Sequence, residues 1–205
     1  LIIGGNDIMK QTTDLQTYSD ISIDNNNFII YDIIKGEDRY YALRKVGYYF
    51  KLLQSFDAKL WKQGSNLQYN LYCRQTYSKL NILLIGCDSG YMYHSTDRGV
   101  SLTRITTPRA SSVVSTNNIY GIDGKDDNSV IIIAAVGGKI GKSTDGGETW
   151  TGKTSGTTNT LYSVVYKDGT FIIAGNSGTI LKSTDDGDTW TSVTSGITDN
   201  IYKMK

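Results

Sequence analysis

Short apolar stretches alternate with polar turns along the chain, most clearly toward the C-terminus. LYSVVY at residues 161–166 alternates apolar and polar side chains, and KDGT follows as a turn. FIIAG, the Gly-containing turn NSG, TILKS, the polar turn TDDGD and TWTSV complete the unit. Because Asp168-Gly169 is a strong hairpin signal, this order predicts short antiparallel strands joined by tight turns.

The same pattern repeats. The stretch FIIAGNSGTILKSTDDGDTWTSV at 171–193 aligns without a gap to residues 131–153 and 83–105, and more weakly to 1–21 and 48–61. The spacing of about 40 to 48 residues is typical of propeller blades with four strands each. The sequence therefore predicts an all-β repeat protein, a β-propeller.

The secondary structure of one segment is ambiguous from its sequence. RYYALRKVGYYFKLLQSF at residues 39–56 has an ambiguous apolar spacing, which fits either a helix or two strands. Its overlap with the repeat favours strands.

The most regular part of the repeat is a polar octet. Ser-x-Asp-x-Gly-x-Thr-Trp occurs in full at 143–150 and 183–190, and its first half recurs at 95–99. This motif resembles the Asp-box, or BNR repeat, of bacterial-neuraminidase-like propellers, a hairpin turn between the third and fourth strands of a blade. The residues assigned to it are Ser95, Asp97, Gly99, Ser143, Asp145, Gly147, Thr149, Trp150, Ser183, Asp185, Gly187, Thr189 and Trp190.

Each residue type in the octet has a physical reason to be there. The carboxylate accepts N–H bonds within the turn, and the glycine permits a positive φ. The tryptophan buries a large ring between neighbouring blades. We therefore expect the motif to serve the fold. The weak copies depart from it at Thr13 and Ala58.

The resemblance implies a ring of five four-stranded blades. The chain starts at a second strand, LIIGG, and ends at DNIYKMK, which aligns with a first strand. Pairing of this C-terminal strand with the N-terminal blade would close the ring. The alternative is a piece of a six- or seven-bladed ring. The expected blades of this single domain are residues 1–24 plus 198–205, 25–65, 66–107, 108–156 and 157–197.

Composition narrows the function classes. The 205 residues carry a formal net charge of +1, which gives no global reason to bind nucleic acid. The longest apolar run, residues 130–136, is far too short for membrane insertion. The single histidine, His94, leaves no His-pair metal site, and we expect it to be a plain surface side chain. No metal and no cofactor are predicted.

Two short motifs resemble ligand-binding loops but lack a defining feature of each. GGKIGKST at 137–144 resembles a phosphate-binding loop, but its spacing is one residue short and a hairpin follows, so we expect a blade turn. DGKDDN at 123–128 lacks the ligand pattern of a calcium loop, so we expect a solvated hairpin turn.

The two cysteines lie on neighbouring strands of one predicted blade. The register carried over from the Asp168-Gly169 hairpin places Cys73 opposite Gly86, so that Cys87 points to the other face. This register predicts two free thiols. A slip of one residue would make the cysteines direct partners.

The leading functional interpretation is a non-catalytic recognition or assembly module that binds a surface glycan or a protein partner. By analogy with the family, the binding loops lie between blades and between second and third strands. The candidate binding residues are Tyr69, Tyr91, Arg109, Asn117, Asn118 and Asn176.

The expected setting is extracellular or in a virion, such as a phage tail or a bacterial surface structure, with neighbouring subunits as further partners. One alternative is a sialidase-like glycoside hydrolase fragment. However, no sialidase-type arginine segment is recognisable, and Glu37 and Glu148 are the only glutamates. A second alternative is a chaperone like the photosystem II assembly factors.

Overall fold

The computed structural model of the chain describes residues 2–4, 9–12, 18–21, 29–46, 48–57, 62–67, 72–106 and 117–204. These residues form five antiparallel sheets that follow one another along the chain. The first sheet has three strands and each of the other sheets has four, and strands adjacent in a sheet are adjacent in the sequence. The predicted all-β, four-stranded repeat is therefore confirmed.

The elements are short and regular. Sheets 1 and 2 contain β1 (Ile2–Gly4), β2 (Met9–Thr12), β3 (Tyr18–Ile21), β4 (Ile29–Lys35), β5 (Tyr40–Val46), β6 (Tyr49–Ser55) and β7 (Lys62–Asn66). Sheet 3 contains β8 (Cys73–Lys79), β9 (Ile82–Cys87), η1 (Asp88–Gly90), β10 (Tyr91–Ser95) and β11 (Thr103–Thr106). Sheets 4 and 5 contain β12 (Ile119–Gly124), β13 (Ile131–Ala135), η3 (Val136–Gly138), β14 (Ile140–Ser143), β15 (Thr151–Lys153), β16 (Leu161–Lys167), β17 (Thr170–Gly175), η4 (Asn176–Gly178), β18 (Ile180–Ser183) and β19 (Thr191–Val193).

Three local predictions are confirmed. Residues 39–56 form two paired strands, β5 and β6, and no helix. The Asp168-Gly169 turn joins β16 to β17, with Lys167 opposite Thr170. The phosphate-loop-like segment is the turn η3 followed by strand β14, as expected of a blade turn.

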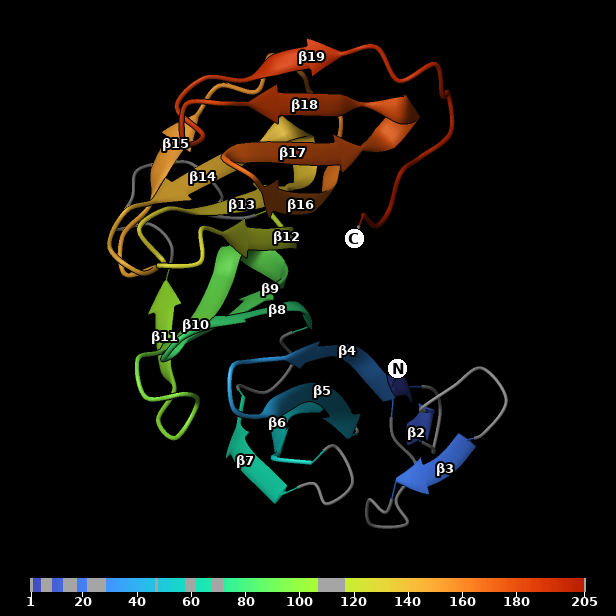
Figure 1. Ribbon diagram of the computed structural model, residues 1–205, viewed down its shortest axis with the longest axis vertical. Coiled ribbons are helices and arrows are strands. Elements are labelled where there is room, and N and C mark those ends of the chain that lie inside the picture. Colours follow the sequence, from blue (N-terminus) through green and yellow to red (C-terminus); the bar gives the residue numbers. More distant parts are fainter. Residues whose placement is uncertain are drawn as a thin grey trace.

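Successive sheets follow an arc, with their first strands on its inner side (Figure 1). The inner strands β4, β8, β12 and β16 contact one another in that order. Apolar side chains fill the space between sheets. One cluster joins sheets 2 and 3, a second joins sheets 3 and 4, and a third joins sheets 4 and 5. Packing between neighbouring sheets thus supplies the core.

Each four-stranded sheet has two distinct ends. One end carries the turn between first and second strands and the turn between third and fourth strands, and is called here the hairpin edge. The opposite end carries the start of the first strand and the turn between second and third strands. It is called here the row edge, after the side chains described below.

The C-terminal segment lies beside sheet 5. The Gly178 N–H donates to the Asp199 carbonyl at 2.8 Å, and the Ile201 N–H donates to the Gly175 carbonyl at 3.0 Å. The Met204 N–H donates to the Ser163 hydroxyl at 3.0 Å. Closure of five sheets into a ring through this segment stays a prediction.

The prediction of two free thiols is wrong. Cys73 and Cys87 form a disulfide between β8 and β9, because they are direct partners in the ladder. The register runs without interruption from Lys79↔Ile82 to Gln75↔Gly86 and then shifts by one residue. This β-bulge at Arg74 brings Cys73 opposite Cys87, whereas an uninterrupted ladder would place Cys73 opposite Asp88. The predicted pairing of Cys73 with Gly86 is also wrong, because Gly86 pairs with Gln75.

His94 is buried, contrary to the expectation of a surface side chain. Only 8% of its surface is exposed, and the described residues offer no hydrogen-bond partner to its Nε2 atom. His94 lies two residues beyond Met92 on β10, so the two side chains share one face of sheet 3. Met92 belongs to the core between sheets 3 and 4, so packing of the next sheet buries this face.

Candidate functional site

The Asp-box hairpins lie on the hairpin edge, and each is held by its own side chains. In sheet 4, the Ser143 hydroxyl donates to Asp145 Oδ1 at 2.7 Å and accepts from the Gly147 N–H at 2.8 Å. Asp145 also accepts from the Thr149 N–H and hydroxyl, and Trp150 Nε1 donates to the Gly147 carbonyl at 3.1 Å. Every polar group that defines the octet therefore has a partner inside it.

The other two boxes repeat this arrangement. In sheet 5, Ser183 and Thr189 donate to Asp185, and Trp190 Nε1 donates to the Gly187 carbonyl. In sheet 3, Ser95 and Ser101 donate to Asp97, and the Gly99 N–H donates to Ser95. Hydrogen bonds from the Ser101 and Ser95 side chains lower the pKa of Asp97 to about 2.

The turn between β6 and β7 keeps part of this pattern. The Ser55 hydroxyl donates to Asp57 Oδ1 at 3.0 Å, as the box serines do to their aspartates. Asp57 thus takes the position of the box aspartate in sheet 2, next to Ala58, which lies outside the described residues. The sequence alignment did not recognise this pair because the turn is one residue shorter.

The box glycines are required for close approach between sheets. A Cβ atom on Gly147, where φ is +96°, would lie 2.8 Å from Leu84 of the preceding sheet. On Gly187, where φ is +80°, it would lie 2.5 Å from Ile132. Any other residue would collide there, so each box docks onto the sheet before it.

The row edge carries a different repeated feature, a bulge in each inner strand. The ladder between first and second strands shifts by one residue in every four-stranded sheet. The residues left without a partner in the ladder are Tyr31, Arg74, Tyr120 and Tyr162. Bulges re-aim side chains and are frequent next to binding sites.

The bulged side chains of sheets 3, 4 and 5 form a continuous row. The Arg74 guanidinium lies 5.9 Å from the Tyr120 ring, and the Tyr120 and Tyr162 rings lie 5.3 Å apart. Tyr202 continues the row at 4.9 Å from Tyr162, and Tyr72 extends its other end at 5.7 Å from Arg74. These five residues are called here the tyrosine–arginine row.

The ends of the row are open and its middle is supported. Tyr72 is 40% exposed and Tyr202 is 63% exposed. Arg74 forms two hydrogen bonds with Asp88, at 2.9 and 3.2 Å, and this carboxylate raises the pKa of Arg74. Lys45 lies 4.0 Å from the Tyr72 ring centre and donates to its hydroxyl at 2.8 Å.

The two edges differ in their number of acidic side chains, and the hairpin edge also carries cations that pair with its carboxylates, such as Arg39, Arg98 and Lys125. Aspartate and glutamate crowd the described turns of the hairpin edge, at Glu37, Asp38, Asp57, Asp97, Asp126, Asp127, Asp145, Glu148, Asp168, Asp185, Asp186 and Asp188. At the row edge, three cations lie next to the tyrosines of the row: Lys45, Arg74 and Lys203. The described turns of this edge contain two carboxylates, Asp88 and Asp199. The row edge thus combines aromatic faces with positive charge.

Only some of the predicted binding residues lie near this row. The Asn118 side chain accepts from the Ser89 N–H at 3.1 Å and donates to the Tyr120 hydroxyl at 3.4 Å. Asn176 opens η4, and Tyr91 opens β10 at 5.0 Å from the Arg104 guanidinium. Asn117 is half-buried at the row edge. Tyr69 and Arg109 lie outside the described residues.

The row itself was not among the predicted binding residues. A sequence pattern nevertheless marks the row. A tyrosine stands at the same point of successive repeats, in NIY at 118–120, TLY at 160–162 and NIY at 200–202. In sheet 3, YCR at 72–74 places Arg74 there. The repeat alignment followed the more regular Asp-box and did not use this position.

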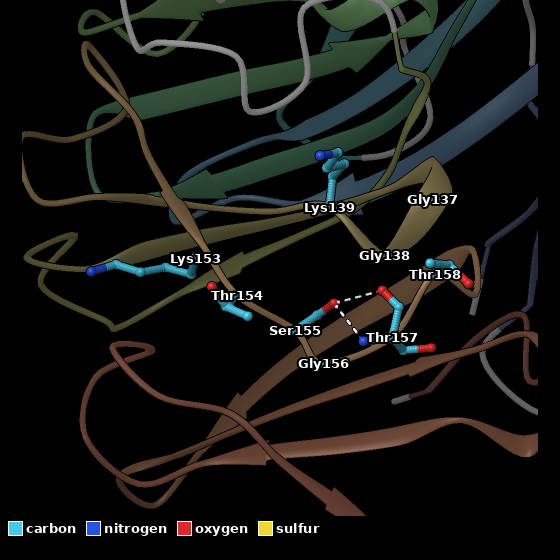
Figure 2. Close-up of a pocket in the computed structure, with 9 residues that line it drawn as sticks. All are labelled: Gly137, Gly138, Lys139, Lys153, Thr154, Ser155, Gly156, Thr157 and Thr158. Atoms are coloured by element: carbon cyan, nitrogen blue, oxygen red, sulfur yellow. Dashed lines mark hydrogen bonds between the residues drawn. The ribbon is translucent and has the colours of Figure 1, made fainter.

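A hollow of about 680 Å³ lies on the outer part of sheet 4 (Figure 2). Its Ser155 hydroxyl donates to the Thr157 carbonyl and accepts from the Thr157 N–H. The Lys139 and Lys153 side chains point away from Ser155 in Figure 2, and Lys153 Nζ contacts Asp188 at 2.7 Å. The Ser155, Thr157 and Lys153 groups that line the hollow are therefore already paired within the protein.

Two features are absent from the described residues. In this part of the chain, no helix has the length and apolarity needed to cross a membrane. The same residues contain no group of three or more His, Cys, Asp or Glu side chains placed to hold a metal ion.

Comparison with solved structures identifies the fold. YCF48 bound to D1 peptide matches with a TM-score of 0.65 and 16% identity, over 94% of this chain and 62% of that one. YCF48 is a β-propeller protein. The chain has a β-propeller fold. YCF48 from Cyanidioschyzon merolae matches with a TM-score of 0.64 and 15% identity, over 95% of this chain and 68% of that one.

An ancestral GH74 enzyme matches the propeller with a TM-score of 0.61 and 19% identity, over 80% of this chain and 24% of the enzyme. The chain thus spans about 62% of the length of the first YCF48 structure and a smaller share of the enzyme. No protein-family model matches the sequence, and no curated protein matches it. At these identities the likeness concerns the fold alone.

Proposed function

We propose that this propeller is a non-catalytic recognition module that binds an extended segment of a protein partner along the tyrosine–arginine row. The observation that carries the proposal is the row itself, in which successive inner strands each present one aromatic or guanidinium group. Tyrosine and arginine are enriched among the residues that contribute most to protein–protein binding energy.

The geometry favours a protein segment for physical reasons. Tyrosine offers a large amphipathic contact area and loses little side-chain entropy on binding. The row is an open strip crossing three sheets, which suits an extended chain better than a small molecule, since small-molecule sites are concave. YCF48, which shares the fold, is seen with a D1 peptide. That likeness supports a peptide ligand and keeps an assembly role among the alternatives.

A hydrolase is the weaker alternative, although a GH74 enzyme shares the fold. Glycosidase chemistry of the usual kind needs two carboxyl groups facing each other across a cleft. The Asp97, Asp145 and Asp185 carboxylates accept hydrogen bonds inside their own turns. Near the row, Asp88 is engaged by Arg74. This distribution supports recognition rather than hydrolysis.

We place the module outside the cytoplasm, in a virion such as a phage tail or on a bacterial surface. The support is the Cys73–Cys87 disulfide, since disulfides persist mainly in oxidising compartments. Neighbouring subunits of a larger assembly are then natural partners for an open row.

Panning of a random-peptide display library on the immobilised chain, in parallel with a glycan array, tests the proposal. We expect enriched peptides whose binding is lost in Tyr202→Ala and Arg74→Ala. Phe56→Ala is the matched control, because Phe56 is an aromatic side chain, 70% exposed, on the hairpin edge. Glycan binding without peptide binding, or peptide binding that is unaffected by both row variants, overturns the proposal.

A further inference from the structure

Two asparagines connect the row to the turns of the preceding sheets. The Asn118 carboxamide accepts from the Ser89 N–H at 3.1 Å and donates to the Tyr120 hydroxyl at 3.4 Å. The Asn200 carboxamide accepts a backbone N–H of η4 at 3.0 Å and donates to the Tyr202 hydroxyl at 3.1 Å. In each case, the asparagine of an Asn-Ile-Tyr sequence contacts the tyrosine two residues further along the chain.

The backbone contacts fix the orientation of both carboxamides. A backbone N–H can only donate, so the atom that it contacts is the carboxamide oxygen. The carboxamide nitrogen, which also can only donate, therefore faces the tyrosine oxygen. Each of these two tyrosine oxygens accepts from its asparagine, and its own proton must be donated elsewhere.

A third hydroxyl of the row is held in the same way. Lys45 Nζ donates to the Tyr72 hydroxyl at 2.8 Å, and an ammonium group has no acceptor to offer in return. Among the residues that the structure describes, no acceptor takes the proton of the Tyr72, Tyr120 or Tyr202 hydroxyl. All three hydroxyls therefore keep a hydrogen-bond donor for a ligand.

The cations beside the row add further donors. The Arg74 guanidinium binds Asp88, and this takes up one of the two carboxylates in the described turns of the row edge. Lys203 Nζ lies 3.4 Å from the Gln75 side-chain oxygen on β8. Guanidinium and ammonium groups cannot accept a hydrogen bond. The row thus presents ring faces, positive charge and hydrogen-bond donors.

We propose that the row binds an acidic segment, an extended peptide whose aspartate or glutamate carboxylates accept from the tyrosine hydroxyls, and that Asn118 and Asn200 are the positioning residues for these hydroxyls. The inference rests on the proposed function, because it names the class of peptide that the row takes. A hydrogen bond to a charged group is roughly twice as strong as one between neutral groups, and the neighbouring cations complement a carboxylate. A basic segment would instead bring donors to donors.

Fluorescence polarisation with three labelled peptides tests the inference. Each peptide alternates threonine, which favours an extended chain, with glutamate, glutamine or lysine. We expect the glutamate peptide to bind about tenfold more tightly than the glutamine peptide, and the lysine peptide not to bind. Equal binding of the glutamate and glutamine peptides, no binding of the glutamate peptide, or tighter binding of the lysine peptide overturns the inference.

Phenylalanine variants separate the hydroxyls from the rings. Tyr120→Phe combined with Tyr202→Phe keeps both rings and removes two donors. The glutamate peptide should then bind about tenfold more weakly, whereas binding of the glutamine peptide should change less. Thr160→Ala is the matched control, because Thr160 occupies the position of the two asparagines in the repeat between them. It should bind all three peptides as the wild type does.

The positioning role has its own variant, Asn200→Asp. The aspartate keeps an acceptor for the η4 N–H, but its carboxylate also accepts the Tyr202 proton, so the preference for glutamate over glutamine should fall. In the Tyr202→Phe background, the same substitution should have little further effect. An equal effect in both backgrounds would reflect charge repulsion alone, and a lowered thermal midpoint with equal losses for all peptides would reflect a structural role. Either result overturns the positioning role.

The same variants distinguish this inference from the proposed function. Suppose that the phenylalanine variants bind the glutamate peptide as the wild type does, while Tyr202→Ala and Arg74→Ala lose binding to the peptides selected by panning. The row then binds peptides, and the acidic preference is wrong. If Tyr202→Ala and Arg74→Ala keep their binding to the selected peptides, the proposed function itself fails.

Discussion

The hairpin edge and the row edge of each sheet repeat in different ways. On the hairpin edge, the boxes keep Ser, Asp and Gly from sheet to sheet, and their hydrogen bonds close within the turn. On the row edge, the repeated position changes from Arg74 to Tyr120 and Tyr162, and part of each side chain faces solvent. The contrast thus lies in the partners of the repeated side chains: those of the boxes are paired within their own turns, whereas those of the row stand outside the ladder and are partly exposed.

Trp150→Ala should give the largest effect and tests whether the hairpin edge serves the fold. Trp150 is 3% exposed and belongs to the core between sheets 3 and 4, so its loss empties a ring-sized volume. We expect a loss of about 3–5 kcal/mol in unfolding free energy, measured by urea denaturation. Trp190→Ala, where the ring is only partly buried, should cost less. Equal losses would contradict this reading of the junctions.

Removing the disulfide tests whether the row edge also contributes to folding. Cys73 and Cys87 are joined across β8 and β9 beside Arg74, with a sequence separation of 14. Loop-closure entropy predicts a loss of about 2–4 kcal/mol on reduction. The thermal midpoint with and without reductant measures it, and the Cys73→Ala, Cys87→Ala double variant, which reductant should not affect, is the control.

Comparing Ser143→Ala with Asp145→Ala separates the stability contribution of the buried serine of a box from that of its exposed carboxylate. The Ser143 side chain is buried, and its removal leaves the Gly147 N–H without its acceptor. We expect a loss of about 1–3 kcal/mol in unfolding free energy by urea denaturation. The carboxylate of Asp145 is exposed, so Asp145→Ala should cost less than Ser143→Ala. The reverse order would show that the carboxylate is the main support of the hairpin.

Acid should weaken the hairpin edge. The pKa of Asp97 in the folded chain is about 2, below its ordinary value of 3.8, because Ser101 and Ser95 donate hydrogen bonds to it. A depressed folded pKa stabilises the fold above the unfolded pKa, and this contribution is lost as pH falls from about 4 toward 2. The urea midpoint followed over this range should therefore fall less steeply in Asp97→Asn than in the wild type. Parallel curves would exclude Asp97 as a source of acid sensitivity.

Tyr202→Ala should have the smallest effect on folding. The side chain is 63% exposed, so the unfolding free energy should change by no more than about 0.5 kcal/mol. Binding to selected peptides, followed by fluorescence polarisation, should nevertheless be lost. A variant that loses stability but keeps binding would reverse the roles given to the two edges.

The sequence was sufficient for the strands of each unit and for the box hairpins. Both depend on local signals, namely period-two apolar alternation and turn residues such as Asp168-Gly169. These signals are strong in the last two repeats, where the boxes are complete. The length of the turn after Ser55 differs, and there the alignment did not recognise the Ser55–Asp57 pair.

The unpredicted disulfide and the unpredicted row have one common cause, the bulge in each inner strand. A bulge inserts one residue without a distinctive composition, so apolar alternation does not reveal it. At Arg74 it pairs Cys73 with Cys87, and it also leaves Arg74 outside the ladder and in the row. The buried position of His94 depends on the next sheet, which local pattern cannot supply.

The bulge also bears on how such a protein changes over generations. A side chain without a partner in the ladder can be exchanged with little effect on strand pairing, and Arg74, Tyr120 and Tyr162 occupy such positions. One substitution therefore alters one contact of the row while the neighbouring repeats stay as they are. If the row binds a partner as proposed, single substitutions at these positions can change its specificity while the strand pairing stays the same.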